Sequence, residues 1–73
     1  MNKKAQYLIE GITKDIVVYL MEDNDMAIAA ALTLFHNSAT FEKLSDGATG
    51  LYIESPAYVY EILKSELKMG KIG

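Results

Sequence analysis

The chain has 73 residues, ten acidic and seven basic, and a net charge of −3 at pH 7. It contains no cysteine and no arginine, which excludes disulfides, thiolate metal sites and the guanidinium forks that recognise phosphate and guanine. A chain this short is predicted to form one domain, residues 1–73, with a thin core that oligomerisation would reinforce.

The first predicted helix runs from about Asn2 to Met21. Its apolar residues recur at steps of three and four, as one face of a helix requires: Ala5, Leu8, Ile9, Ile12, Ile16, Tyr19 and Leu20. Val17, Val18 and Met21 widen this face, so they are candidate contact residues. Gly11 costs the helix up to ~1 kcal/mol relative to alanine, which close approach of another helix would explain.

The second predicted helix, Met26–His36, follows the acidic segment 22–25. Asp and Asn are preferred N-cap residues, so this segment is predicted to cap the helix. Ile28, Leu32 and Phe35 share one predicted face. The run 26–35 is apolar except for Thr33 and is too short for the roughly 20 residues of a membrane-spanning helix. We therefore expect no membrane segment and a cytoplasmic protein.

Asn37-Ser38 is the next cap signal, and it precedes a short predicted helix, Ala39–Ser45. Phe41 and Leu44 are expected to face inward. Gly47 is predicted to end this helix in the left-handed conformation, and Gly50 to permit a tight turn within a loop over 48–54.

Ser55-Pro56 predicts the start of the last helix, because serine is a good N-cap and proline suits the first helical position. The helix is expected to reach about Lys68 and to be followed by a frayed tail, residues 70–73. Its predicted buried residues are Val59, Ile62, Leu63 and Leu67. The fold class is therefore all-α, a small bundle of three to four helices, two long and one or two short.

The sequence predicts no catalytic, metal or cofactor site. The segment that begins at Asp23 resembles a calcium loop, but Ala27, Ile28 and Leu34 stand where an oxygen ligand, glycine and glutamate are needed. The Gly47–Gly50 turn has no basic residue to hold phosphate. His36, the only histidine, ends a predicted helix and is expected to be structural or solvent-facing.

Tyrosines cluster near the last helix, with Tyr52, Tyr58 and Tyr60 separated by few residues. Successive helical residues are about 100° apart, so if Val59 faces the core at least one of its neighbouring tyrosines is partly exposed. Tyrosine is enriched at protein interfaces. The predicted contact patch comprises Leu51, Tyr52, Ile53, Tyr58 and Tyr60, and packing of these rings at the edge of the core is the alternative.

The block Gly-Leu-Tyr-x-x-Ser-Pro-x-Tyr-Val-Tyr, residues 50–60, resembles a family of short uncharacterised bacterial proteins of about this length, helical throughout. Ala30-Ala31-Leu32 and Asn37-Ser38 extend the resemblance over nearly the whole chain. Such proteins are similar to small accessory proteins encoded in operons, some beside toxin-like genes. The resemblance implies this association and brings no catalytic residue with it.

Together these features predict a small, cytoplasmic, non-catalytic protein-interaction module that associates with itself or with another protein and binds no nucleic acid. One alternative is an antitoxin-like or DNA-associated regulatory protein, against which the missing arginines argue. Another is a small-ligand binder that uses a groove between the first and last helices.

Overall fold

The computed structural model describes residues 3–69, and every regular element in that range is helical, so the prediction of an all-α fold is confirmed. The predicted start at Asn2 and the predicted tail, 70–73, lie outside the described residues. The elements in chain order are α1 (Lys3–Asn24), α2 (Ile28–His36), α3 (Ala39–Ser45), the 3₁₀ turns η1 (Gly47–Thr49) and η2 (Leu51–Ile53), and α4 (Pro56–Lys68).

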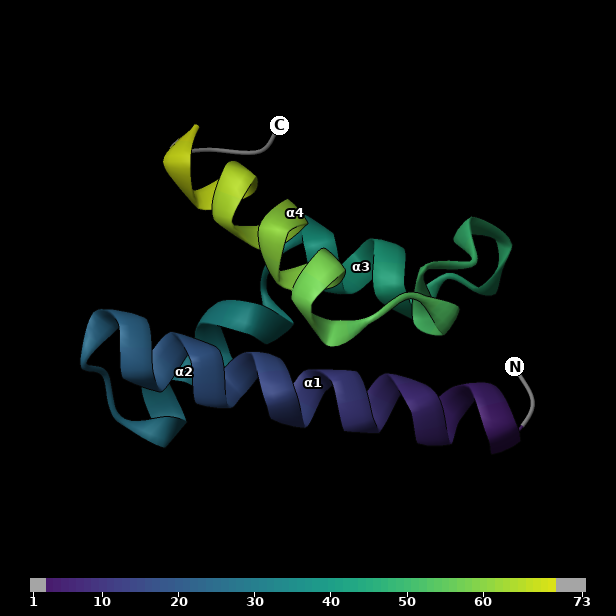
Figure 1. Ribbon diagram of the computed structural model, residues 1–73, viewed down its shortest axis with the longest axis horizontal. Coiled ribbons are helices and arrows are strands. Elements are labelled where there is room, and N and C mark those ends of the chain that lie inside the picture. Colours follow the sequence, from purple (N-terminus) through teal and green to yellow (C-terminus); the bar gives the residue numbers. More distant parts are fainter. Residues whose placement is uncertain (1–2, 70–73) are drawn as a thin grey trace.

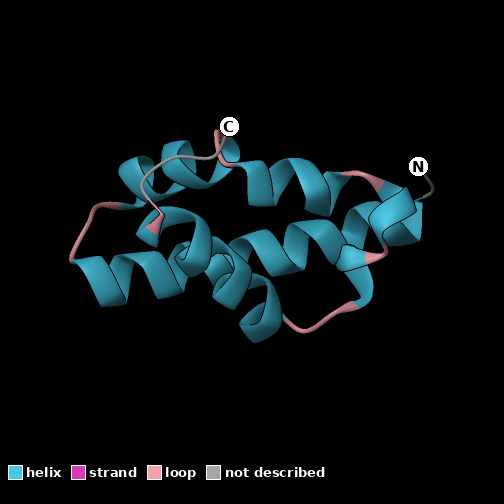
Figure 2. Cartoon of the chain, turned by 90° about the horizontal axis from the view of Figure 1, so that it is seen from above, coloured by secondary structure: helices cyan, strands magenta, loops and turns pink. Residues whose placement is uncertain are grey.

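Helix α1 lies along one side of the molecule, and α3 and α4 lie together on the other (Figure 1). Helix α2 turns back beside the C-terminal part of α1. Seen from above, short loops join α1 to α2 and α2 to α3, whereas the turns η1 and η2 lie between α3 and α4 (Figure 2). The arrangement surrounds one core, to which each of the four α-helices contributes.

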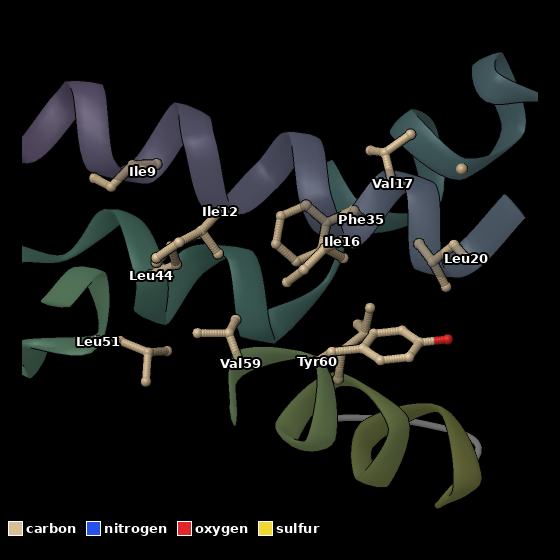
Figure 3. Packing of buried hydrophobic residues seen from close by; sticks show 12 residues of the cluster. Ile9, Ile12, Ile16, Val17, Leu20, Phe35, Leu44, Leu51, Val59 and Tyr60 are labelled. Atoms are coloured by element: carbon tan, nitrogen blue, oxygen red, sulfur yellow. The ribbon is translucent and has the colours of Figure 1, made fainter. Parts of the chain in front are cut away.

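The core forms where the apolar face of α1 meets the other helices. Ile12, Ile16 and Leu20 project from α1 toward side chains of α3 and α4 (Figure 3). The periodicity of α1 therefore predicts its buried face correctly. The large side chains with no exposed area are Ile16, Leu20, Phe35, Leu44, Val59 and Leu63.

Two of the predicted caps are present. The Ser38 hydroxyl accepts a hydrogen bond from the Phe41 N–H at 3.0 Å and begins α3. The Ser55 hydroxyl accepts one from the Tyr58 N–H at 3.1 Å and begins α4, with Pro56 as its first residue. Both bonds satisfy backbone donors that the helix itself leaves without a partner.

The boundary between α1 and α2 differs from the prediction. Helix α1 continues to Asn24, whose side-chain amide donates to the Leu20 carbonyl at 3.2 Å. Asp25 then ends it in the left-handed region, with φ 53°. The residue at the N-cap of α2 is Ala27, which has no side-chain hydrogen bond to offer. The prediction that the acidic segment caps α2 was therefore wrong.

Of the expectations for three glycines, those for Gly47 and Gly11 need correction. The C-cap of α3 is Asp46 with φ −88°, and the left-handed glycine is Gly50, with φ 67°, between η1 and η2. The prediction for Gly47 was wrong, and that for Gly50 was correct. Apart from its chain neighbours and the backbone of its own helix, no atom lies within 4 Å of a Cβ built on Gly11, so a closely packed neighbouring helix does not explain this glycine.

Candidate interaction groove

A groove of about 680 Å³ runs along α1 on the side that faces α2 and α3. Its walls on α1 extend from Gln6 to Met21, roughly 22 Å at about 1.5 Å per residue. The residues that line it are mainly apolar: Ile9, Val17, Val18, Met21, Ile28, Leu32 and Phe41. The others are polar: Gln6, Glu10, Thr13, Lys14, His36 and Ser45.

Helical spacing produces the wall opposite α1. Ile28, Leu32 and His36 are four residues apart on α2, so their side chains lie on one face. The His36 ring packs edge-on against Phe41 of α3, with 4.7 Å between ring centroids. Phe41 in turn meets Phe35 at 5.3 Å, which connects this wall of the groove to the core.

Several apolar side chains of the groove are exposed to water. Val18 is 43% exposed, Ile28 57% and Leu32 36%, whereas Val17 is buried and Met21 half-buried. Ile28 and Leu32 were predicted to share one face of α2 with Phe35. That prediction was wrong for Ile28 and Leu32, because α2 buries the adjacent positions, Ala31 and Phe35, against α1 and α3.

Helix α2 carries no Asp, Glu or Lys, although much of it is in contact with solvent. Ala29, Ala30 and Thr33 are exposed on its outer side, next to the exposed Ile28 and Leu32. A surface helix normally has a polar outer face, and a helix that is apolar all round is normally buried. The sequence of α2 is therefore typical of a buried helix, although α2 lies on the surface.

The predicted tyrosine patch is divided by the fold. Leu51 and Tyr60 are buried in the core and Tyr52 is half-buried against it, while Ile53 and Tyr58 are 69% and 53% exposed. The contact role predicted for Leu51 and Tyr60 is thus corrected. Val17 projects from α1 toward α2 (Figure 3) and is also buried, although it lines the groove.

Tyr60 joins α4 to the C-terminal part of α1. Its ring lies 4.9 Å from that of Tyr19, and its hydroxyl donates a hydrogen bond to the Asp23 carboxylate at 2.7 Å. Burial and this hydrogen bond raise the pKa of Tyr60 to about 12, because both favour the protonated phenol. The tyrosine is therefore a packing residue.

A second hollow, of about 630 Å³, lies between the N-terminal part of α1 and η2. Tyr7 and Ile53, both largely exposed, line it together with Tyr52 and Pro56. It also contains the charged residues Lys14, Asp15 and Glu54. Tyr58 lines neither hollow, so the exposed residues of the predicted patch do not share one hollow.

A cluster of polar groups connects α4 to the start of α3. The Glu66 carboxylate on α4 accepts hydrogen bonds from the N–H groups of Ala39 and Thr40, both at 2.9 Å, and from the Thr40 hydroxyl at 2.7 Å. Burial raises the pKa of Glu66, but these three hydrogen bonds and the nearby Lys43 outweigh burial and leave the pKa below its usual value. Glu66 therefore acts as a cap for α3 provided by another helix.

Within residues 3–69, no three His, Asp or Glu side chains come close enough together to hold a metal ion. Over the same residues, no helix combines the length and apolar character needed to cross a membrane.

No family model, curated protein or solved structure matches the chain. The resemblance over residues 50–60 stays a prediction. Of the predicted contact residues, the structure brings Val17, Val18 and Met21 together in the groove. Sequence reasoning missed Ile28, Leu32 and Phe41 as its other wall. The uncharged run 26–35 was the available signal for it.

Proposed function

We propose that this chain is a small non-catalytic protein-interaction module and that the groove between α1, α2 and α3 is its contact surface. The observation that carries the proposal is the exposure of Ile28 and Leu32 on a helix with no charged residue. Water contact with apolar area is unfavourable by about 25 cal/mol per Å², so covering this face stabilises a complex.

The shape of the groove suits a helical surface of a protein. It extends along roughly four turns of α1, and apolar grooves of such length typically bind the apolar face of a helix. The polar residues that line it include one acid, Glu10, and one lysine, Lys14, so its charges nearly balance. Contact is then driven by burial of apolar side chains rather than by electrostatic attraction.

The alternative functions have less support. A DNA-associated regulator needs a basic face, and the groove places Glu10 beside Lys14 in a chain without arginine. A small-ligand binder would use the hollow between α1 and the start of α4, but three charged residues line that hollow. Ligand pockets also enclose most of the surface of their ligand, whereas Tyr7 and Ile53 of this hollow are 75% and 69% exposed.

Site-specific photo-crosslinking in cells that express the protein natively tests the proposal. A benzophenone amino acid replaces Leu32 in the groove, and a control protein carries it at Glu61, which is exposed on α4. We expect one discrete protein adduct from position 32, either with another protein or with a second copy, and none of comparable yield from position 61. Equal or absent adducts at the two positions would overturn the proposed function.

A further inference from the structure

We infer that the groove binds a second copy of this chain, so that two α2 helices face each other across a two-fold axis. The inference rests on the proposed function and names its partner. In a two-fold contact the same surface serves both copies, so the face must be compatible with itself in shape and in charge.

The charge distribution favours a second copy. The chain has a net charge of −3, so two copies repel each other on average. Among the α-helices over residues 3–69, α2 is the only one without Asp, Glu or Lys. Two α2 helices can therefore approach each other without opposing acidic groups of their own, and the one acid in the groove, Glu10, is accompanied by Lys14.

The shape of this surface is also compatible with the association of two copies. Ile28 and Leu32 line the groove and are partly exposed, whereas Ala29, Ala30 and Thr33 on the outer side of α2 are small. Small side chains let two helices approach closely, because interaxial distance depends on the residues at the contact. The partly exposed side chains of each copy can then enter the groove of the other.

The same surface is poorly suited to selecting a different protein. Interfaces that discriminate between partners usually do so with charges whose juxtaposition in the wrong complex is repulsive. Helix α2 offers none. A small chain without cysteine also gains buried apolar area from a second copy, which its own thin core cannot supply.

Sedimentation equilibrium of the purified protein between roughly 5 and 200 μM tests the inference, because self-association depends on concentration. The test variant is Ile28→Glu. Ile28 is 57% exposed and begins α2, where a carboxylate is favoured by the helix dipole, so the variant is expected to keep its fold. The matched control is Ile53→Glu, which places the same charge at a 69% exposed isoleucine outside the groove.

We expect the wild type and Ile53→Glu to dimerise alike, and Ile28→Glu to associate at least ~10-fold more weakly with unchanged helicity. A second groove variant, Leu32→Glu, should behave as Ile28→Glu does. A wild type that stays monomeric over the whole range overturns the second-copy inference, as does equal weakening by Ile53→Glu or no weakening by the groove variants. Crosslinking of position 32 to another protein would in that case leave the proposed function standing, whereas no crosslink would remove both.

Discussion

Helices α2 and α4 both pack against α1, yet their outer faces differ. Helix α4 buries Val59 and Leu63 completely and turns charged residues such as Glu61 to the solvent. Helix α2 buries Ala31 and Phe35 as completely, but its outer side has no charge. The chain alone therefore covers most of the apolar face of α4, although Leu67, which was predicted to be buried, is 41% exposed. It leaves the uncharged outer side of α2 uncovered, and a partner is best sought there.

The largest expected effect is on stability, when one leucine in α4 and one in α2 are each truncated to alanine. Leu63→Ala removes a fully buried side chain and should lower the free energy of unfolding by about 2–5 kcal/mol. Leu32→Ala should cost the monomer less than about 1 kcal/mol, because part of this side chain already contacts water. Urea denaturation at low protein concentration measures both, and equal losses would contradict the comparison.

The Glu66 cap tests how firmly α4 is attached to its neighbour. Glu66→Ala should lower the free energy of unfolding by about 1.5–3 kcal/mol, because it leaves backbone donors of Ala39 and Thr40 without their partner. Glu61→Ala is the control. It removes an exposed ion pair with Lys64 and should change stability by less than about 1 kcal/mol.

The stability difference between wild type and Glu66→Ala should also depend on pH. The pKa of Glu66 is lowered in the folded protein, so its contribution is fully present above the pKa of the unfolded chain. The contribution is lost as the pH falls through the lower, folded pKa. The stability difference between wild type and Glu66→Ala should therefore shrink in acid, and a difference that grows in acid would contradict this assignment.

Removing the cap of α4 and adding a cap to α2 should change the free energy of unfolding in opposite directions. Ser55→Ala removes the cap of α4 and should lower the free energy of unfolding by about 1 kcal/mol. Ala27→Asp should raise it by a similar amount of roughly 1 kcal/mol, because Ala27 already has the extended backbone of an N-cap and lacks only an acceptor. Thermal denaturation of both variants measures this, and a loss in Ala27→Asp would show that α2 is not limited by its cap.

An effect of similar size is expected from the hydroxyl of Tyr60. Tyr60→Phe should lower the free energy of unfolding by about 0.5–1.5 kcal/mol, because it removes the hydrogen bond to Asp23. The folded pKa of Tyr60 is raised to about 12, so its contribution is complete below the unfolded pKa of 10 and is lost as the pH rises toward 12. The two proteins should therefore differ less in stability at pH 11 than at pH 8, as denaturant titrations at the two pH values would show.

The elements that the sequence predicts well are those defined by local chemistry. Ser38 and Ser55-Pro56 place two helix starts, because a cap depends on residues within one turn. The burial of Ile12 and Ile16 follows from the periodicity of α1 alone.

The remaining features depend on contacts between distant residues. Asp23 stays within α1 and accepts a hydrogen bond from Tyr60, a partner that no local pattern reveals. Periodicity requires one of Tyr58 and Tyr60 to be exposed without showing which one, and the ring of Tyr19 helps to cover Tyr60. The groove likewise exists only because α2 and α3 pack beside α1.

The cap that Glu66 provides has a consequence for the order in which the chain folds. Helix α3 has seven residues, too few to be stable in isolation, and its first turn depends on a carboxylate far along the chain. Helix α3 should therefore form only when α4 docks, late in folding and together with it. A chain cut before Pro56 is expected to lose the circular-dichroism signal of both helices, although it removes the residues of only one.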